Sequence, residues 1–346
     1  MAGEKNSGWT GTFRTAAVFC AIMLVLSQSA QQGLSVSSPS WGMFSLWEGV
    51  TRWSIPALFM AWGMEDLEGG KSAGSWKKVL WGLGVLVFWG FLYALAGYLL
   101  GGGTLSLGGL GAALAAALRG EVASHLWLLF PLLGLRLVLP VLGRFAAGAS
   151  RGEVVYILAL AFLLAGVLPI WTNFHPNHVL VTLTGRLEIH LVLGWVGYYL
   201  AGWFFSHYTI GRLEELILYV LGILGLGLTL WGDRLVGGSR ALWYGYTAPG
   251  VACTAAAVCV LLRYVLSVSQ ERARQSKVHH LGEFVVGVYL FHQIWVLVLQ
   301  RLGVGLDWLP DLVRVPLGAL ILFLLSIPPA WLLSRLPAVG QRLTQG

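Results

Sequence analysis

Long apolar runs are the feature that most limits what this chain can fold into. A helix needs about 20 mostly apolar residues to cross roughly 30 Å of hydrocarbon, and ten runs of that kind follow one another. They lie near 11–32, 47–64, 79–100, 123–143, 153–171, 187–206, 213–231, 243–266, 280–299 and 314–334. Little chain remains between them for a separate soluble domain.

The runs predict helices because backbone polar groups inside a bilayer find no water, which leaves helices or a closed barrel. Strands of a barrel would alternate polar and apolar residues, and these runs do not. We therefore expect an all-α fold, a polytopic helical membrane bundle of about ten transmembrane helices. It would form one domain over residues 1–346, with 335–346 as a short cytoplasmic tail.

The charged residues indicate how the bundle is oriented. Only 11% of residues are charged and 57% are hydrophobic, against about 25% charged in soluble domains. With a cytoplasmic N-terminus, most of the 22 Lys and Arg fall in inner connections, as the positive-inside rule requires. We expect both termini in the cytoplasm, and we read the net charge of +7 as a topology signal rather than as a sign of a nucleic-acid partner.

Metal and disulfide chemistry have little support in the sequence. Cys20, Cys253 and Cys259 lie inside apolar runs without CxxC spacing, so they read as small core residues. The outer loop 171–190 holds three histidines, at 175, 178 and 190, but Pro176 disfavours a metal-binding helix face there. The alternatives are a polar rim that contacts a sugar or other hydrophilic acceptor, a metal site, or an ordinary solvated loop; we expect no metal.

Charged groups inside the runs are candidates for function, because each costs about 2.5–3.5 kcal/mol at mid-bilayer even on lenient scales. Arg14 lies near the cytoplasmic end of the first run, where it can also simply reach the headgroups. Arg52 follows Glu48 by one helical turn, so the two side chains can form an i, i+4 ion pair.

Two histidines lie in the runs as well. In a helix, the eleven residues from His125 to Arg136 make about 1100°, or three turns and 20°, so both would share one inward face about 16 Å apart. His292 lies in the middle of the ninth run, where a lone histidine is more often a satisfied core residue than a catalyst. Together these groups predict a polar interior that suits an anionic ligand, since guanidinium groups match phosphate and carboxylate. Such an interior could equally serve a transporter.

Five stretches resemble, in the same order, motifs of membrane-bound acyltransferase family 3, the bacterial O-acetyltransferases that modify surface polysaccharides. They are RWSIPALFMAWGMEDL, SWKKVLWGLGVLVFWGFLY, SHLWLLFPLLGLRLVLPVLGRF, GWVGYYLAGWFFSHY and GEFVVGVYLFHQIWV. The resemblance covers nearly the whole chain. It implies a multi-pass protein of the bacterial cytoplasmic (inner) membrane that moves an acyl group, usually acetyl, from acyl-CoA to a hydroxyl of a glycan or lipid-linked sugar.

The sequence departs from the family at its proposed base. The family's first span carries an Arg, then ten residues, then a catalytic His. Arg14 matches the Arg, but gap-free counting puts Val25 at the His, and a shifted register offers only Ser27 or Gln28. In addition, Trp62 replaces the Ser of the family's Ser-Gly, and Arg136 replaces a Tyr. Either another histidine acts, or the fold has been kept while the chemistry was lost or changed.

Our leading hypothesis is an acyl-CoA-dependent O-acyltransferase with acetyl-CoA as co-substrate. Its expected site residues are a base, His125 or alternatively His292; cations for the donor, Arg14, Arg52, Lys77 and Lys78; and acceptor or oxyanion contacts from Arg136, Trp127, Glu48 and His190. The alternative hypothesis is a non-catalytic member that translocates a glycan or lipid precursor, or scaffolds surface-polymer assembly. The missing first-span histidine favours that alternative.

Overall fold

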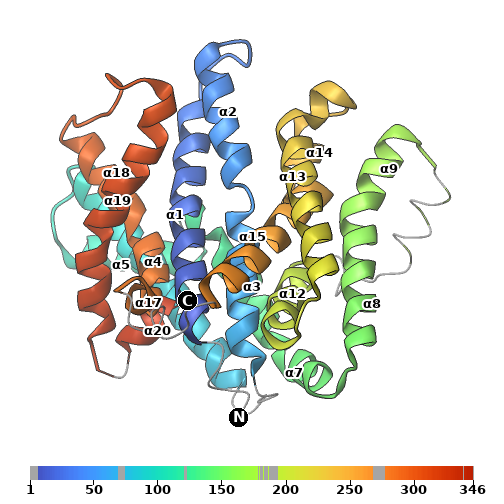
Figure 1. Cartoon of the computed structure of the whole chain (residues 1–346). Helices are drawn as coiled ribbons and strands as arrows, with labels where there is room; N and C mark the ends of the chain where they lie inside the picture. Colours follow the sequence, from blue (N-terminus) through green and yellow to red (C-terminus); the bar gives the residue numbers. More distant parts are fainter. Residues whose placement is uncertain are drawn as a thin grey trace.

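The fold is a bundle of helices, seen in a computed structural model (Figure 1). The structure describes residues 7–68, 75–120, 123–177, 194–267, 277–337 and 339–345, together with Val179, Thr182 and Arg186. Within these residues there is helix and no strand, as the apolar runs predict.

Six helical segments are long and apolar enough to cross a membrane. They are α1 (Ser7–Gln31), α4 (Ser75–Leu100), the rod Arg151–Phe174 made of α8 (Arg151–Ala161), the π-helical η3 (Phe162–Val167) and α9 (Leu168–Phe174), α13 (Arg212–Leu235), the segment Arg240–Val265 made of α14 (Arg240–Tyr244) and most of α15 (Pro249–Ser267), and α19 (Asp311–Ser334). The chain is therefore a polytopic helical membrane protein, whereas the expected ten spans are not confirmed.

Proline accounts for two of the expected spans that are not single helices. The run at 47–64 is divided into α2 (Pro39–Thr51) and α3 (Ser54–Asp66), because the ring of Pro56 is incompatible with a helical carbonyl at Arg52. The run at 123–143 consists of the 3-10 turn η2 (Ser124–Leu128), α6 (Leu129–Leu137) and α7 (Leu139–Gly148), with a 62° bend before Pro140.

The other two expected spans are not described as single long helices. The run at 187–206 is represented by α12 (Val196–His207), and its first part lies outside the described residues. The run at 280–299 is divided between α17 (Lys277–Gly282) and α18 (Val285–Arg301). A further short apolar helix, α5 (Leu107–Leu118), begins at Ser106, whose side chain caps it by accepting from the Gly109 amide, and packs on α4.

Helices α3 and α12 lie backbone to backbone at the centre of the bundle. A side chain at Gly63 would collide with the carbonyl oxygen of Tyr199, and one at Gly202 would collide with that of Met60. The two glycines therefore allow the close approach that carries Tyr199 to the end of α3. This contact positions one of the polar networks described below.

The C-terminal segment is folded into the bundle rather than a free tail. Residues 340–345 form α20 (Gly340–Gln345), which packs on α18, α19 and α4. Thr344 is fully buried, and the Trp89 indole donates to the Leu343 carbonyl at 3.1 Å. The expected short cytoplasmic tail over 335–346 thus includes a helix packed on the bundle, and its side of the membrane stays a prediction.

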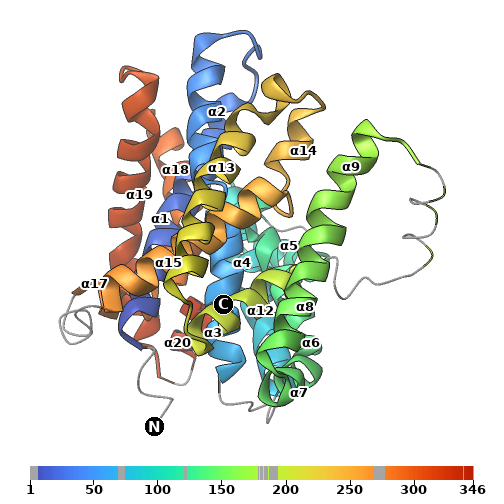
Figure 2. The ribbon, with the colours of Figure 1, turned by 45° about the vertical axis from the view of Figure 1, so that its right-hand side comes forward.

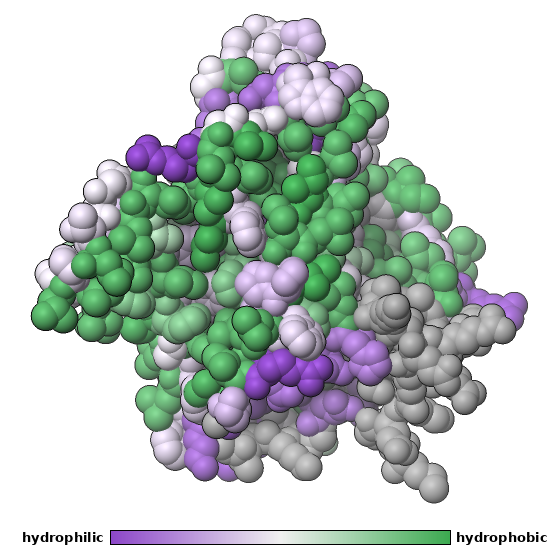
Figure 3. Space-filling model, turned by 90° about the vertical axis from the view of Figure 1, so that its left-hand side faces the viewer, coloured by the Kyte–Doolittle hydropathy of each residue, from purple (hydrophilic) through white to green (hydrophobic). Residues whose placement is uncertain are grey.

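The surface is that of a protein in a bilayer. On the face shown in Figure 3, apolar residues cover the middle, and hydrophilic residues gather toward the upper and lower ends. The second view of the ribbon shows the α8–η3–α9 rod at the outer edge of the bundle, with α12 and α13 next to it (Figure 2). Both chain ends lie in the lower half of Figure 1, opposite the loop between α1 and α2.

Candidate active site

Six of the expected site residues fall into three groups rather than one cavity: Glu48, Arg52, His125, His292, Lys78 and Arg136. The first is the Glu48 network, which consists of Glu48, Arg52, Arg240, Gln28 and Gln31. The carboxylate of Glu48 accepts from Arg52 Nη1 at 3.0 Å, Gln28 Nε2 at 3.1 Å, Gln31 Nε2 at 3.0 Å and also from Arg240 Nη2. The expected pair of Glu48 and Arg52 is confirmed. One carboxylate facing two guanidinium groups leaves a surplus positive charge.

Aromatic rings pack against both arginines of the Glu48 network, and a backbone carbonyl also accepts from Arg52. Arg52 lies 4.0 Å from the ring centre of Tyr246 and donates through Nε to the Tyr244 carbonyl at 2.6 Å. Arg240 lies 4.0 Å from the ring centre of Tyr244 and 4.4 Å from that of Trp41. Cation–π contact of this kind stabilises a guanidinium that has lost part of its water.

The second group is the histidine pair, His125 and His292, which are 3% and 0% exposed. Their ring centres are 5.1 Å apart, and the rings of Tyr93 and Tyr289 pack around His125 at 4.7 and 5.9 Å. Nδ1 of His292 contacts the Tyr289 carbonyl oxygen. Within the described chain, Nε2 of His292 and both ring nitrogens of His125 have no hydrogen-bond partner of good geometry.

That contact fixes the tautomer of His292. A carbonyl oxygen only accepts, so Nδ1 of His292 carries the proton, and Nε2 of the neutral ring is left with a free lone pair. The structure thus brings together the two candidate bases that the sequence places 167 residues apart.

The third group is the Asp66 network, which consists of Asp66, Arg136, Lys78 and Tyr199. Asp66, at the end of α3, accepts from Lys78 Nζ at 2.7 Å, Arg136 Nε at 3.2 Å and the Tyr199 hydroxyl at 2.7 Å. The inward orientation expected for His125 and Arg136 is confirmed, since both are buried. The single continuous α-helix assumed for them is wrong, because His125 lies in the 3-10 turn before α6.

Arg14 is buried beside the Asp66 network, at the end of the bundle that holds the N-terminus. Its guanidinium forms an ion pair with Glu65 and donates to the Gly282 carbonyl at 3.4 Å. Lys77 is exposed, with its ammonium 5.8 Å from the Trp76 ring centre. Arg14 and Arg52 were expected to hold one donor together, but they belong to networks at opposite ends of α3, a helix roughly 20 Å long by its 13 residues.

The remaining expected contacts are not part of the histidine pair. Trp127 stacks on Tyr246 at 5.4 Å and lies 5.6 Å from Trp195. His190 and His178 lie outside the described residues, whereas His175 stacks on Trp171 at 4.3 Å. In the described part of the chain, no group of three or more His, Cys, Asp or Glu is arranged to hold a metal ion.

The three positions that compete for the missing first-span histidine differ in surroundings. Val25 is a half-buried apolar side chain, and the Ser27 hydroxyl donates to the Met23 carbonyl in its own helix at 2.6 Å. The Gln28 side chain donates to Glu48 itself. An amide at this place can donate to Glu48 but cannot act as a base near neutral pH.

Sequence reasoning missed Glu65, which pairs with Arg14, and four members of the networks: Asp66, Tyr199, Arg240 and Gln31. The first two end the motif RWSIPALFMAWGMEDL, where adjacent acidic residues at the end of an apolar run were the available signal. Arg240 reads as an ordinary loop cation, because only the fold brings it to Glu48.

A family model described as an acyltransferase domain matches residues 18–335, which is most of the chain. The chain belongs to acyltransferase family 3. The match contains the histidine pair and all of the Glu48 and Asp66 networks, whereas Arg14 precedes it. No curated protein and no solved structure gives a significant match. This member of the acyltransferase family is thus a multi-pass membrane protein with three groups of buried, chemically active side chains.

Proposed function

We propose that this protein is an O-acyltransferase of the bacterial inner membrane, which moves an acetyl or other small acyl group from acyl-CoA to a hydroxyl of a cell-surface glycan or lipid-linked sugar. Family membership supports the acyltransferase class. The observation that carries the site is the histidine pair, with its unpartnered nitrogens in a buried aromatic cage.

In the proposed reaction, Nε2 of His292 takes the proton of the acceptor hydroxyl as its oxygen attacks the thioester carbonyl. The carbon–sulfur bond then breaks, the CoA sulfur leaves as a thiolate, and the proton passes to it. Tyr289 positions His292 through its carbonyl, in the way a third group orients the base of a catalytic triad. An N–H of the neighbouring His125 would stabilise the developing oxyanion. Both rings are buried, so the substrates enter through a movement of the surrounding helices.

The donor would bind at the end of the bundle that holds Arg14. Arg14, Lys78 and Arg136 gather there against two carboxylates, Glu65 and Asp66, and Lys77 lies exposed nearby in sequence. The surplus of cations suits the phosphates of coenzyme A. Arg52, by contrast, belongs on the acceptor side with Glu48, because it lies at the other end of α3.

The test combines donor binding with single-site variants in purified protein. We expect saturable binding of acetyl-CoA by calorimetry in wild type and its loss in Arg14→Ala. We expect His292→Asn, which keeps a donor for the Tyr289 carbonyl but removes the base, to bind acetyl-CoA normally and to lose about 10²–10⁴-fold in kcat. His175→Asn, a histidine outside the pair, is the matched control. Full activity of both His292→Asn and His125→Ala would contradict the proposed base.

A non-catalytic translocator or scaffold is the second candidate, favoured by the apolar or amide side chains at the first-span histidine position. It predicts no acetyl-CoA binding in folded protein and no dependence on either histidine. The same calorimetry therefore separates the two functions before any acceptor is identified.

A further inference from the structure

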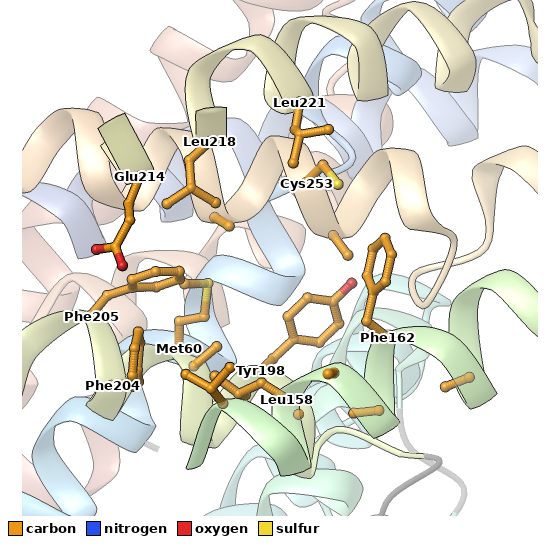
Figure 4. A pocket seen from close by; sticks show the side chains of 18 of the residues that line it. Met60, Leu158, Phe162, Tyr198, Phe204, Phe205, Glu214, Leu218, Leu221 and Cys253 are labelled. Carbon is orange, nitrogen blue, oxygen red and sulfur yellow. The ribbon is translucent and has the colours of Figure 1, made fainter. Parts of the chain in front are cut away.

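A cavity of about 590 Å³ is lined by residues other than those of the three polar groups. Its walls come from α8 and η3, α12, α13 and α15, with Met60 of α3 at its base (Figure 4). The lining is almost entirely apolar; its polar residues include Thr247 and Arg151, which pairs with Glu214. Figure 4 shows Glu214 at one end and Tyr198 well separated from it. Pockets of this size hold ligands as large as a lipid chain segment.

The helices that flank the cavity face lipid. Val155 and Phe162 on the α8–η3 rod are 45% and 37% exposed, and Ile217 and Leu221 on α13 are 48% and 42% exposed, while all four also line the cavity. The rod switches to π-helical geometry at Phe162–Val167, a local change that is frequent at functional sites. Hydrocarbon in the surrounding bilayer is therefore the material that meets this cavity.

A short segment joins the cavity to the Glu48 network. Thr247 lines the cavity, the ring of Tyr246 lies under Arg52, and the carbonyl of Tyr244 accepts from the same arginine. The Tyr198 hydroxyl, on the cavity side, donates to the Tyr246 carbonyl. The deep end of an apolar cavity thus lies next to the surplus positive charge shared by Arg52 and Arg240.

The other end of the cavity carries no such surplus. Nη2 of Arg151 donates to both carboxylate oxygens of Glu214, at 2.7 and 2.8 Å, so the two charges satisfy each other. An anionic head group would gain little binding free energy at that end. It gains more at the Glu48 network, where two guanidinium groups share one carboxylate.

We propose that this cavity binds the hydrocarbon chain of the acceptor, a phosphate-linked sugar lipid whose phosphate is held by the surplus charge at Arg52 and Arg240. This inference rests on the proposed function and narrows its acceptor to a lipid-linked sugar. The chain enters from the bilayer between α8–η3 and α13. The phosphate then lies between the chain and the sugar hydroxyl that is acylated.

The test compares two acceptors in cavity-filling variants. The probes are a polyprenyl-phosphate hexose and the soluble methyl hexoside, each with acetyl-CoA. We expect Ala201→Phe and Ala252→Phe, which place a ring in the cavity from two different helices, to lower kcat/KM at least about tenfold for the lipid-linked probe. The soluble probe should stay within about twofold, as should both probes in the exposed control Ala112→Phe on α5.

Photolabelling gives a second readout that needs no turnover. A polyprenyl phosphate with a diazirine in its chain should label cavity residues of wild type, and Ala201→Phe should lower that labelling at least about tenfold. Equal labelling in both proteins, or equal loss of activity on both probes, would overturn the chain site. If wild type acylates neither probe but is labelled in the cavity, the proposed reaction fails while the lipid site stands.

Discussion

Two buried carboxylates, Glu48 and Asp66, compensate positive charge inside the bundle, because each of them pairs with two cations. Glu48 and Asp66 are both 8% exposed. Removing one partner of a buried ion pair leaves an uncompensated charge inside the protein. The free energy of unfolding then falls by more than when an exposed pair is broken. The histidine pair is different, since its unpartnered nitrogens are buried without any such compensation. A catalytic role, as proposed above, is one physical explanation for buried groups of this kind.

Removal of Asp66 should show how much the buried network contributes to stability. Asp66→Ala leaves Arg136 and Lys78 without their carboxylate, and we expect the free energy of unfolding to fall by about 3–5 kcal/mol. Thermal unfolding in detergent measures the loss. Asp307→Ala, which removes an exposed partner of Arg314, should cost no more than about 1 kcal/mol. Equal melting temperatures for the two variants would show that the Asp66 network is not a stabilising contact.

Among the elements, the contact between α3 and α12 does the most to position the candidate site. It brings Tyr199 onto Asp66 and places Met60 at the base of the cavity. The bend before Pro140 serves the same end, since it changes the direction of the chain a few residues after Arg136.

A methyl group between α3 and α12 should separate them. We expect Gly63→Ala and Gly202→Ala to destabilise the protein by about 1–3 kcal/mol or more, because each added Cβ meets a backbone carbonyl that cannot rotate away. The control is Gly84→Ala on α4, where the added Cβ meets nothing within 4 Å. Thermal unfolding of the three variants measures the loss. A lower melting temperature in the first two variants alone would indicate the tight contact, whereas the same change in all three would contradict it.

At the scale of the whole molecule, the charged networks lie at opposite ends of the bundle along the direction that crosses the membrane. The N-terminal end holds Arg14 and the Asp66 network, and the opposite end holds the Glu48 network, with the lipid-facing cavity between α8–η3 and α13. From the charge bias of the loops we predict that the N-terminal end faces the cytoplasm. Donor and acceptor would then approach from opposite ends.

Thiol labelling in intact cells tests that direction. We expect Ser35→Cys, in the loop between α1 and α2, to react with a membrane-impermeant maleimide from outside. We expect Arg342→Cys, an exposed position on α20, to react only after the cells are opened. Wild type is the background control, since Cys20, Cys253 and Cys259 are at least partly buried. The reverse pattern would invert the assignment of donor and acceptor sides.

The sequence by itself determined the class of fold, the family and several of the buried polar residues. Apolar runs in lipid admit helices because every backbone group must be bonded within its segment, and the i, i+4 pair of Glu48 and Arg52 follows from helix geometry alone. Only the tertiary structure decided which groups meet. Arg240 joins Glu48, Tyr199 joins Asp66, and His125 lies beside His292 because helices far apart in the chain pack together. The physical reason is that spacing along one helix determines contacts within that helix only, whereas these partners lie on other helices, which packing of the whole bundle brings together.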